Sequence, residues 1–241
     1  MIELIGFDGD DTLWHSEGYY QSTHEQFERL LANYVDLADA RLHERLLATE
    51  KRNIRLFGYG AKGMTLSMIE TAIEITGERI SAGDLHRLLE MGKQILQHPV
   101  ELLPGIREAV AALADEYQIV LITKGDLFHQ EAKVARSGLA DIFHRIEIVS
   151  EKDPATYLRV LGEFDLAPER FAMIGNSLRS DIEPVVQLGG WGVYMPYHVT
   201  WAHEKETAFD RHHPHVVEVS APAELPDALA ILASRAAQAA A

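Results

Sequence analysis

The sequence predicts an α/β protein in which an all-helical insert interrupts a doubly wound parallel sheet after its first strand. Residues 2–7 form a mostly apolar run with the length and branching of a buried strand. From Pro104 onward, similar runs alternate with helical patterns of about ten residues, which is typical of a parallel sheet. Between them, strand character disappears. The predicted domains are a catalytic core of residues 1–15 and 101–241 and a helical domain of residues 16–100.

The individual elements follow from apolar periodicity and from turn residues. In the insert, glycine, aspartate and serine signals separate four predicted helices, at 18–34, 37–56, 63–76 and 83–97. Ser81, with Asp84 three residues later, is typical of a helix N-cap. After Pro104, the pattern predicts helices at 105–115, 127–137 and 155–164 and strands at 119–122, 145–149, 171–174, 192–195 and 216–219. The alanine-rich tail, 232–241, predicts a last helix that frays.

Size and composition indicate an ordinary globular protein. The chain has 241 residues, of which 47% are hydrophobic, enough for one domain and a smaller insert. No run approaches about 18 apolar residues, so we expect a cytoplasmic protein that does not enter a membrane. The chain has no cysteine, which excludes disulfides and thiolate chemistry. A formal charge of −15 disfavours binding to nucleic acid or anionic membranes. The oligomeric state stays open.

Three carboxylates directly follow the first predicted strand. They are Asp8, Asp10 and Asp11, and Thr12 comes next. In extended geometry Asp8 and Asp10 project to the same side, so they can converge just past the strand's carboxyl end, a common ligand position in parallel sheets. Two such charges repel each other unless a cation lies between them or one is protonated. The plainer alternative is an acidic turn that caps a helix.

Polar residues also follow three further predicted strands. Taken singly, each has a simple explanation as a helix cap, a solvated lysine or an acid in a first helical turn. Because the carboxyl ends of parallel strands share one edge of a sheet, all four groups can meet there. The four groups are Asp8 with Asp10, Thr123 with Lys124, Lys152, and Asn176 with Asp181.

Together these motifs resemble the haloacid dehalogenase-like hydrolase superfamily, most of whose members are magnesium-dependent phosphatases. The resemblance covers nearly the whole chain and implies a Rossmann-like core with a helical cap that closes over the site and selects substrates. It implies that Asp8 is the nucleophile and forms an aspartyl-phosphate. Asp10 would be the general acid and base, and Lys152 would offset the negative charge of Asp8 and of the transition state.

The resemblance also implies where phosphate binds. The phosphate-binding residues would be Thr123, Lys124 and Gly125. The Thr123 hydroxyl and nearby backbone N–H groups would hold the phosphoryl oxygens. Asparagine is frequent in the family where this chain has Lys124. This lysine could contact phosphate or point to solvent.

Magnesium is the implied metal, because an all-oxygen site beside a phosphate suits a small hard cation. Its ligands would be an Asp8 oxygen, the Asp10 backbone carbonyl and a residue of the fourth group. Family phosphatases usually have aspartate where this chain has Asn176. An asparagine carbonyl can coordinate magnesium but brings no charge. Asp181 could bind directly or through water, so the choice between Asn176 and Asp181 stays open.

One stretch of the insert, Phe57 to Gly63, contains three glycines and Lys62. It predicts either a mobile loop that brings a cation and backbone donors to an anionic substrate, or a helix C-cap with an exposed turn.

The resemblance favours a phosphatase acting on a small phosphorylated metabolite, such as a sugar phosphate, phosphoglycolate or a nucleotide. One alternative is hydrolytic dehalogenation of a 2-haloacid, which uses the first aspartate without a metal. Retention of Asp8, Asp10 and Thr12 together argues against it. The other alternative, motivated by Asn176, is a protein that binds phosphorylated ligands and has lost most of its catalysis.

Overall fold

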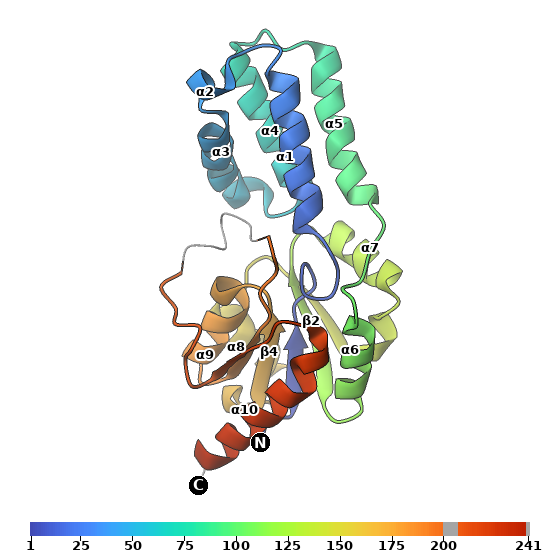
Figure 1. The fold of residues 1–241 in the computed structure, drawn as a ribbon, viewed down its shortest axis with the longest axis vertical. Helices are drawn as coiled ribbons and strands as arrows, with labels where there is room; N and C mark the ends of the chain where they lie inside the picture. Colours follow the sequence, from blue (N-terminus) through green and yellow to red (C-terminus); the bar gives the residue numbers. More distant parts are fainter. Residues whose placement is uncertain (200–206, 240–241) are drawn as a thin grey trace. The chain divides into compact units, whose positions relative to one another are not determined.

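The computed structural model describes residues 1–199 and 207–239 (Figure 1). The chain divides into two compact units. The core unit contains Met1–Glu17, Val100–Lys124 and the described residues from Gln130 onward. The helical unit contains Gly18–Pro99 together with a short second stretch, Gly125–His129. The stretch directly after the second strand therefore clusters with the insert.

The core unit is built on a six-stranded sheet in which every described strand pair is parallel. Its strand order is β3-β2-β1-β4-β5-β6. The strands are β1 Leu4–Phe7, β2 Gln118–Lys124, β3 Arg145–Val149, β4 Phe171–Gly175, β5 Trp191–Tyr194 and β6 Val216–Glu218. The order runs outward from β1 in both directions, so the predicted doubly wound parallel sheet is confirmed.

Alternating side chains of the strands bury the two faces of the sheet. Ile5 and Phe7 pack in one core with α6 (Ile106–Ala114), α7 (Leu127–Ser137) and α10 (Leu225–Ala239). Leu4 points the other way, into a second core with α8 (Pro154–Gly162) and α9 (Glu183–Gln187). Each fully buried aliphatic or phenyl side chain contributes roughly 1.5–3 kcal/mol, so both faces hold the strand ends in place.

Several boundaries in the core unit differ from the prediction. Strand β2 continues through Thr123 and Lys124, because both pair with β3. Helix α10 begins at Leu225, seven residues before the predicted tail helix, and buried leucines anchor it. Residues 240–241 of that prediction lie outside the described residues. The shorter helical turns are η1 Ala140–Ile142, η2 Pro168–Arg170, η5 Pro222–Glu224 and a π-helix, η3 Leu178–Ile182.

The helical unit has a hydrophobic core of its own, centred on Phe27, Met68 and Leu88. Its helices are α1 Glu17–Leu31, α2 Leu37–Ala40, α3 Leu42–Phe57, α4 Ala61–Thr76 and α5 Ala82–Gln97. The single helix predicted over 37–56 is wrong, because Arg41 adopts a left-handed φ of 48° and separates α2 from α3. The predicted cap of α5 is confirmed, since Ser81 Oγ accepts a hydrogen bond from the backbone N–H of Asp84 at 3.0 Å.

The glycine-rich stretch at the end of α3 contains a cap and a helix start. Gly58, at a φ of 74°, donates its N–H to the carbonyl of Ile54 and ends α3. Helix α4 begins at Ala61, so Lys62 and Gly63 are helical, two residues earlier than predicted. Lys62 pairs with Asp126 of the second stretch at 2.9 Å. No helix in residues 1–199 and 207–239 is long and apolar enough to cross a membrane.

Candidate active site

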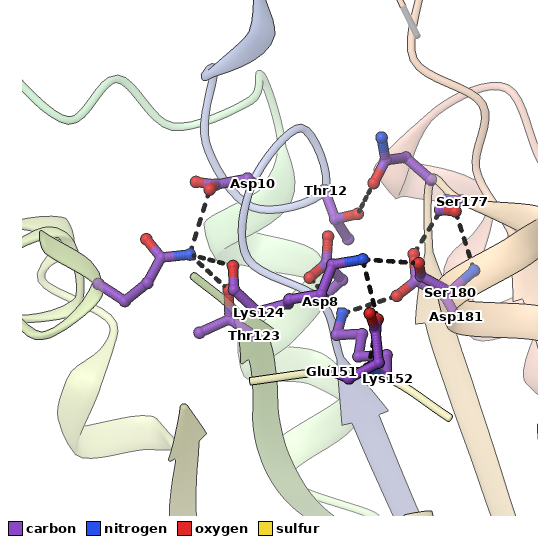
Figure 2. Close-up of polar contacts among 12 residues, drawn as sticks. Asp8, Asp10, Thr12, Thr123, Lys124, Glu151, Lys152, Ser177, Ser180 and Asp181 are labelled. Carbon is purple, nitrogen blue, oxygen red and sulfur yellow. Dashed lines mark hydrogen bonds and ion pairs between the residues drawn. The ribbon is translucent and has the colours of Figure 1, made fainter. Parts of the chain in front are cut away.

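The predicted polar groups meet at the carboxyl edge of the sheet, where the strand order reverses between β1 and β4. Figure 2 shows side chains from all four strand ends directed toward this edge. The labelled residues belong to the carboxyl end of β2 or to the segments that follow β1, β3 and β4.

A tight turn carries the first motif. The backbone N–H of Asp8 donates to Ile174 of β4 at 2.9 Å, and the carbonyl of Gly9 accepts from Leu13 at 2.8 Å. A Cβ at Gly9 would lie 2.9 Å from the Trp14 ring and 3.1 Å from Thr123 Oγ1. Only glycine therefore fits between Asp8 and Asp10 without displacing a neighbour.

The nucleophile candidate shares a buried lysine with a second carboxylate. Lys152 Nζ donates to Asp8 Oδ1 at 2.5 Å and to Asp181 Oδ1 at 2.7 Å (Figure 2). Burial raises the pKa of Asp8 to about 7, while Lys152 opposes the shift and the carboxylates of Asp181 and Asp10 add to it. Burial acts to lower the pKa of Lys152, but Asp181 and Asp8 outweigh it, so its pKa is raised and its charge is kept.

The π-helix after β4 holds Asp181 in place. Ser177 Oγ accepts from the N–H of Ser180 at 3.0 Å and caps this turn, and the N–H of Ser177 donates to Asp181 Oδ2 at 2.9 Å. A Cβ at Gly175 would lie 2.2 Å from Asp181 Oδ2, so the glycine leaves room for the carboxylate. Both Asp181 oxygens thus have donors within the core unit.

The carboxylate of Asp10 meets donors from its own turn and from α7. Trp14 Nε1 donates to Oδ1 at 2.6 Å, and Gln130 Nε2 donates to Oδ2 at 3.1 Å. Lys133 Nζ contacts both oxygens, at 2.7 and 2.9 Å. Sequence reasoning missed Gln130 and Lys133, because their three-residue spacing on an amphipathic helix gives no sign that they face a polar site.

The three predicted phosphate-binding residues have different surroundings. The hydroxyl of Thr123 is buried and accepts from Gln130 Nε2 at 2.8 Å. Lys124 Nζ contacts Ser180 Oγ, which follows β4, at 3.1 Å and Glu151, which follows β3, at 3.3 Å. Gly125 has a positive φ of 154° and clusters with the helical unit.

One end of the Asn176 amide lies 3.2 Å from both Asp8 Oδ2 and the backbone oxygen of Asp10. With its nitrogen there, the amide donates to both oxygens. With its oxygen there, that oxygen lies 3.2 Å from each of the other two oxygens, close to the roughly 3.0 Å that separates neighbouring ligands around Mg²⁺. Their hard-oxygen chemistry and their spacing therefore fit a magnesium ion. Among the described residues, no three His, Cys, Asp or Glu side chains form a metal-binding group.

Comparison with known proteins identifies the class. Residues 2–189 match the model of the haloacid dehalogenase-like hydrolase family, and the chain belongs to that family of hydrolases. A solved structure of a haloacid dehalogenase-like hydrolase from Xanthomonas campestris is similar over 98% of this chain and 94% of that chain. Its TM-score is 0.89 and its sequence identity is 56%. The predicted family resemblance is therefore confirmed.

A more distant relative has a stated activity. Glyceraldehyde 3-phosphate phosphatase from Pyrococcus furiosus is 31% identical over 101 residues, which are 39% of this chain and 42% of that protein. This chain thus spans about two fifths of the length of that relative. The putative hydrolase YfnB from Bacillus subtilis, solved with magnesium bound, has a TM-score of 0.62 and 16% identity over 96% of this chain and 98% of that chain. The second likeness shows the fold alone.

Proposed function

We propose that this hydrolase is a magnesium-dependent phosphatase that cleaves a small phosphate monoester through an aspartyl-phosphate. The observation that carries the proposal is the short contact of Asp8 with the buried ammonium group of Lys152. A second acid, Asp10, follows Asp8 by two residues. A nucleophile, its counter-charge and an acid–base group are what two-step phosphoryl transfer needs.

In the first step, a carboxylate oxygen of Asp8 attacks phosphorus while the bond between phosphorus and the ester oxygen breaks. The departing oxygen takes a proton from Asp10, and the alcohol leaves. Lys152 favours the ionised form of Asp8, because its charge opposes the rise in pKa that burial causes. The products of this step are the alcohol and an aspartyl-phosphate at Asp8.

In the second step, a water oxygen attacks phosphorus and gives a proton to Asp10. The bond between phosphorus and the Asp8 oxygen breaks, which releases inorganic phosphate and restores both carboxyl groups. The Thr123 hydroxyl and the nearby Lys124 and Gly125 supply donors for the phosphoryl oxygens. This use of one aspartate twice replaces one difficult displacement by two easier ones.

Lysines at the strand ends offset part of the negative charge of the site, which favours an anionic substrate despite the net charge of −15. Lys124, Lys133 and Lys152 have their ammonium groups among the acids at the strand ends. The Pyrococcus relative is a phosphatase, which supports the same class of substrate.

For the metal, we propose Asp8 Oδ2, the Asp10 backbone oxygen and the Asn176 amide oxygen as protein ligands. Asp181 is the weaker candidate, because both of its oxygens already accept hydrogen bonds, from Lys152 and from Ser177. A bound magnesium ion supplies positive charge for the phosphoryl oxygens and orients them toward Asp8. The magnesium in the Bacillus structure supports this choice of metal.

The helical unit is proposed as a cap that selects the substrate, a small phosphorylated metabolite. Dehalogenation is the alternative within the family, and the donors that surround Asp10 argue against it, because that reaction does not require this acid. A binding protein with weakened catalysis is the other alternative and rests on Asn176. The cytoplasmic location stays a prediction.

The test is release of inorganic phosphate from a panel of phosphorylated metabolites, with magnesium or with chelator. We expect metal-dependent release that disappears in Asp8→Asn. Binding of phosphate esters without release would favour the binding protein. Halide release from a 2-haloacid, unaffected by chelator, would favour dehalogenation.

A further inference from the structure

The carboxylate of Asp10 accepts hydrogen bonds from Trp14, Gln130 and Lys133, which belong to two distant segments. Trp14 belongs to the turn after β1, whereas Gln130 and Lys133 lie on α7, more than 100 residues later in the chain. Their exposed fractions are only 1%, 2% and 9%, so water cannot easily replace them. The Asp10 side chain itself is 29% exposed, and hydrogen bonds that involve a charged group are roughly twice as strong as neutral ones.

Lys133 differs from the other two donors in two respects. It alone of the three carries a charge, and it alone contacts both Asp10 oxygens, at 2.7 and 2.9 Å. Gln130 divides its amide nitrogen between Asp10, Thr123 and the Lys124 carbonyl, so it also serves the proposed phosphate site. The ammonium group of Lys133 further contacts Ser16 Oγ at 3.3 Å, which fixes it from the turn side.

The site already described has Lys152 for Asp8, and no step of the proposed reaction uses Lys133. Asp10 follows a glycine and has a side chain that extends away from Asp8 toward α7 (Figure 2). An acid that must deliver a proton to one leaving oxygen has to be held within a narrow range of positions. A charged contact to both oxygens restrains the rotation of the carboxylate more than a single hydrogen bond does.

We propose that Lys133 is a positioning residue. It orients the carboxyl group of Asp10 for the transfer of a proton to the leaving oxygen. This inference rests on the proposed phosphatase function. It assigns to α7 a role in the reaction, although none of the predicted site residues belongs to that helix.

The effect of removing Lys133 on the rate of hydrolysis should therefore depend on the leaving group of the ester. An alkyl phosphate releases a strongly basic alkoxide unless its oxygen is protonated, so its cleavage needs Asp10 in position. The phenolate of 4-nitrophenyl phosphate leaves without that help. A variant that lacks Lys133 is therefore expected to discriminate against alkyl esters, whereas a variant that only loosens the site affects both esters alike.

The experiment measures kcat/KM, which reports on the first irreversible step, for an alkyl phosphate and for 4-nitrophenyl phosphate at saturating magnesium. For Lys133→Met we expect a fall of about 10- to 100-fold with the alkyl ester, within the range that general acid catalysis supplies. With the aryl ester we expect a change of about threefold or less. Lys133→Arg should recover much of the loss, because it restores a charged donor.

The matched control is Lys93→Met, since Lys93 is an exposed lysine of α5 that pairs with Glu90. It should leave both rates unchanged. Thermal unfolding shows whether each variant folds. If Lys133→Met does not fold, it is replaced by Lys133→Gln, which keeps a hydrogen-bond donor without the charge. Equal losses with both esters, or no loss with either, would overturn the role of Lys133. If the wild-type protein hydrolyses neither ester in an Asp8-dependent way, the proposed function itself fails.

Discussion

Lys152 donates to Asp8 at 2.5 Å, and the two side chains are buried together at the strand ends. The same ammonium group also serves Asp181, so one positive charge balances two carboxylates. Burial raises the pKa of Asp8 although a lysine touches it, and the charge of Asp181 adds to the rise. The three residues act as one electrostatic unit.

Lys152→Met is expected to destabilise the protein by about 3–5 kcal/mol, because it leaves two buried carboxylates without a counter-charge. Adding Asp181→Asn to this variant should recover part of the loss. Denaturant unfolding in chelator measures the free energy of unfolding of the single and the double variant. Strictly additive effects in the double-mutant cycle would contradict a shared unit.

Asp8→Asn is expected to lower kcat by about 10³-fold or more, since removing a nucleophile removes its reaction path. The fold should stay intact, because the substitution removes one of the two buried carboxylates that share the charge of Lys152. Phosphate release and thermal unfolding measure the two effects. The control is Asp141→Asn, an exposed acid of η1. Comparable turnover by the folded Asp8→Asn variant would exclude the nucleophile assignment.

Asn176→Asp is expected to lower the magnesium concentration for half-maximal rate by about tenfold, because it adds a charge to the ligand set. In chelator the same change should lower the unfolding temperature, since a third acid then lies beside Asp8 and Asp10. Magnesium should therefore raise the unfolding temperature of the variant more than that of the wild type. An unchanged metal requirement would remove residue 176 from the proposed ligands.

The stability of the helical unit should depend on pH through Asp84. Hydrogen bonds from Tyr34 and Ser81 lower the pKa of this carboxyl. Because the folded pKa lies below the unfolded one, the stabilisation is complete above the ordinary value near 4 and is lost as pH falls through the folded value. Tyr34→Phe removes the hydrogen bond that is the largest cause of the lowered pKa of Asp84. Its unfolding temperature should be lower than that of the wild type at pH 7, and the difference should shrink toward pH 3. A constant difference would show that Asp84 ionisation plays no part.

The sheet and the meeting of its four strand ends could be predicted because both depend on local signals. Apolar runs such as Ile119 to Ile122 mark buried strands, and polar residues directly after them lie at one edge. The length of β2 was underestimated because Thr123 and Lys124 are polar, yet they pair with β3.

Other features depend on contacts that no local pattern carries. Arg41 breaks a helix by adopting a conformation that is uncommon for residues other than glycine. The π-helix that holds Asp181 departs from the period of 3.6 on which helix prediction relies. Lys133 has the sequence context of a solvated helical lysine, and only its placement beside Asp10 shows otherwise.

The membership of residues 125–129 in the helical unit makes the chain pass between the two units four times. Transplanting residues 18–99 alone into another member of the family would leave Lys62 without its own Asp126. A chimera that exchanges substrate preference should therefore carry both stretches. The segments proposed to select the substrate are therefore discontinuous in the sequence, and one of them, residues 125–129, immediately follows the proposed phosphate-binding strand.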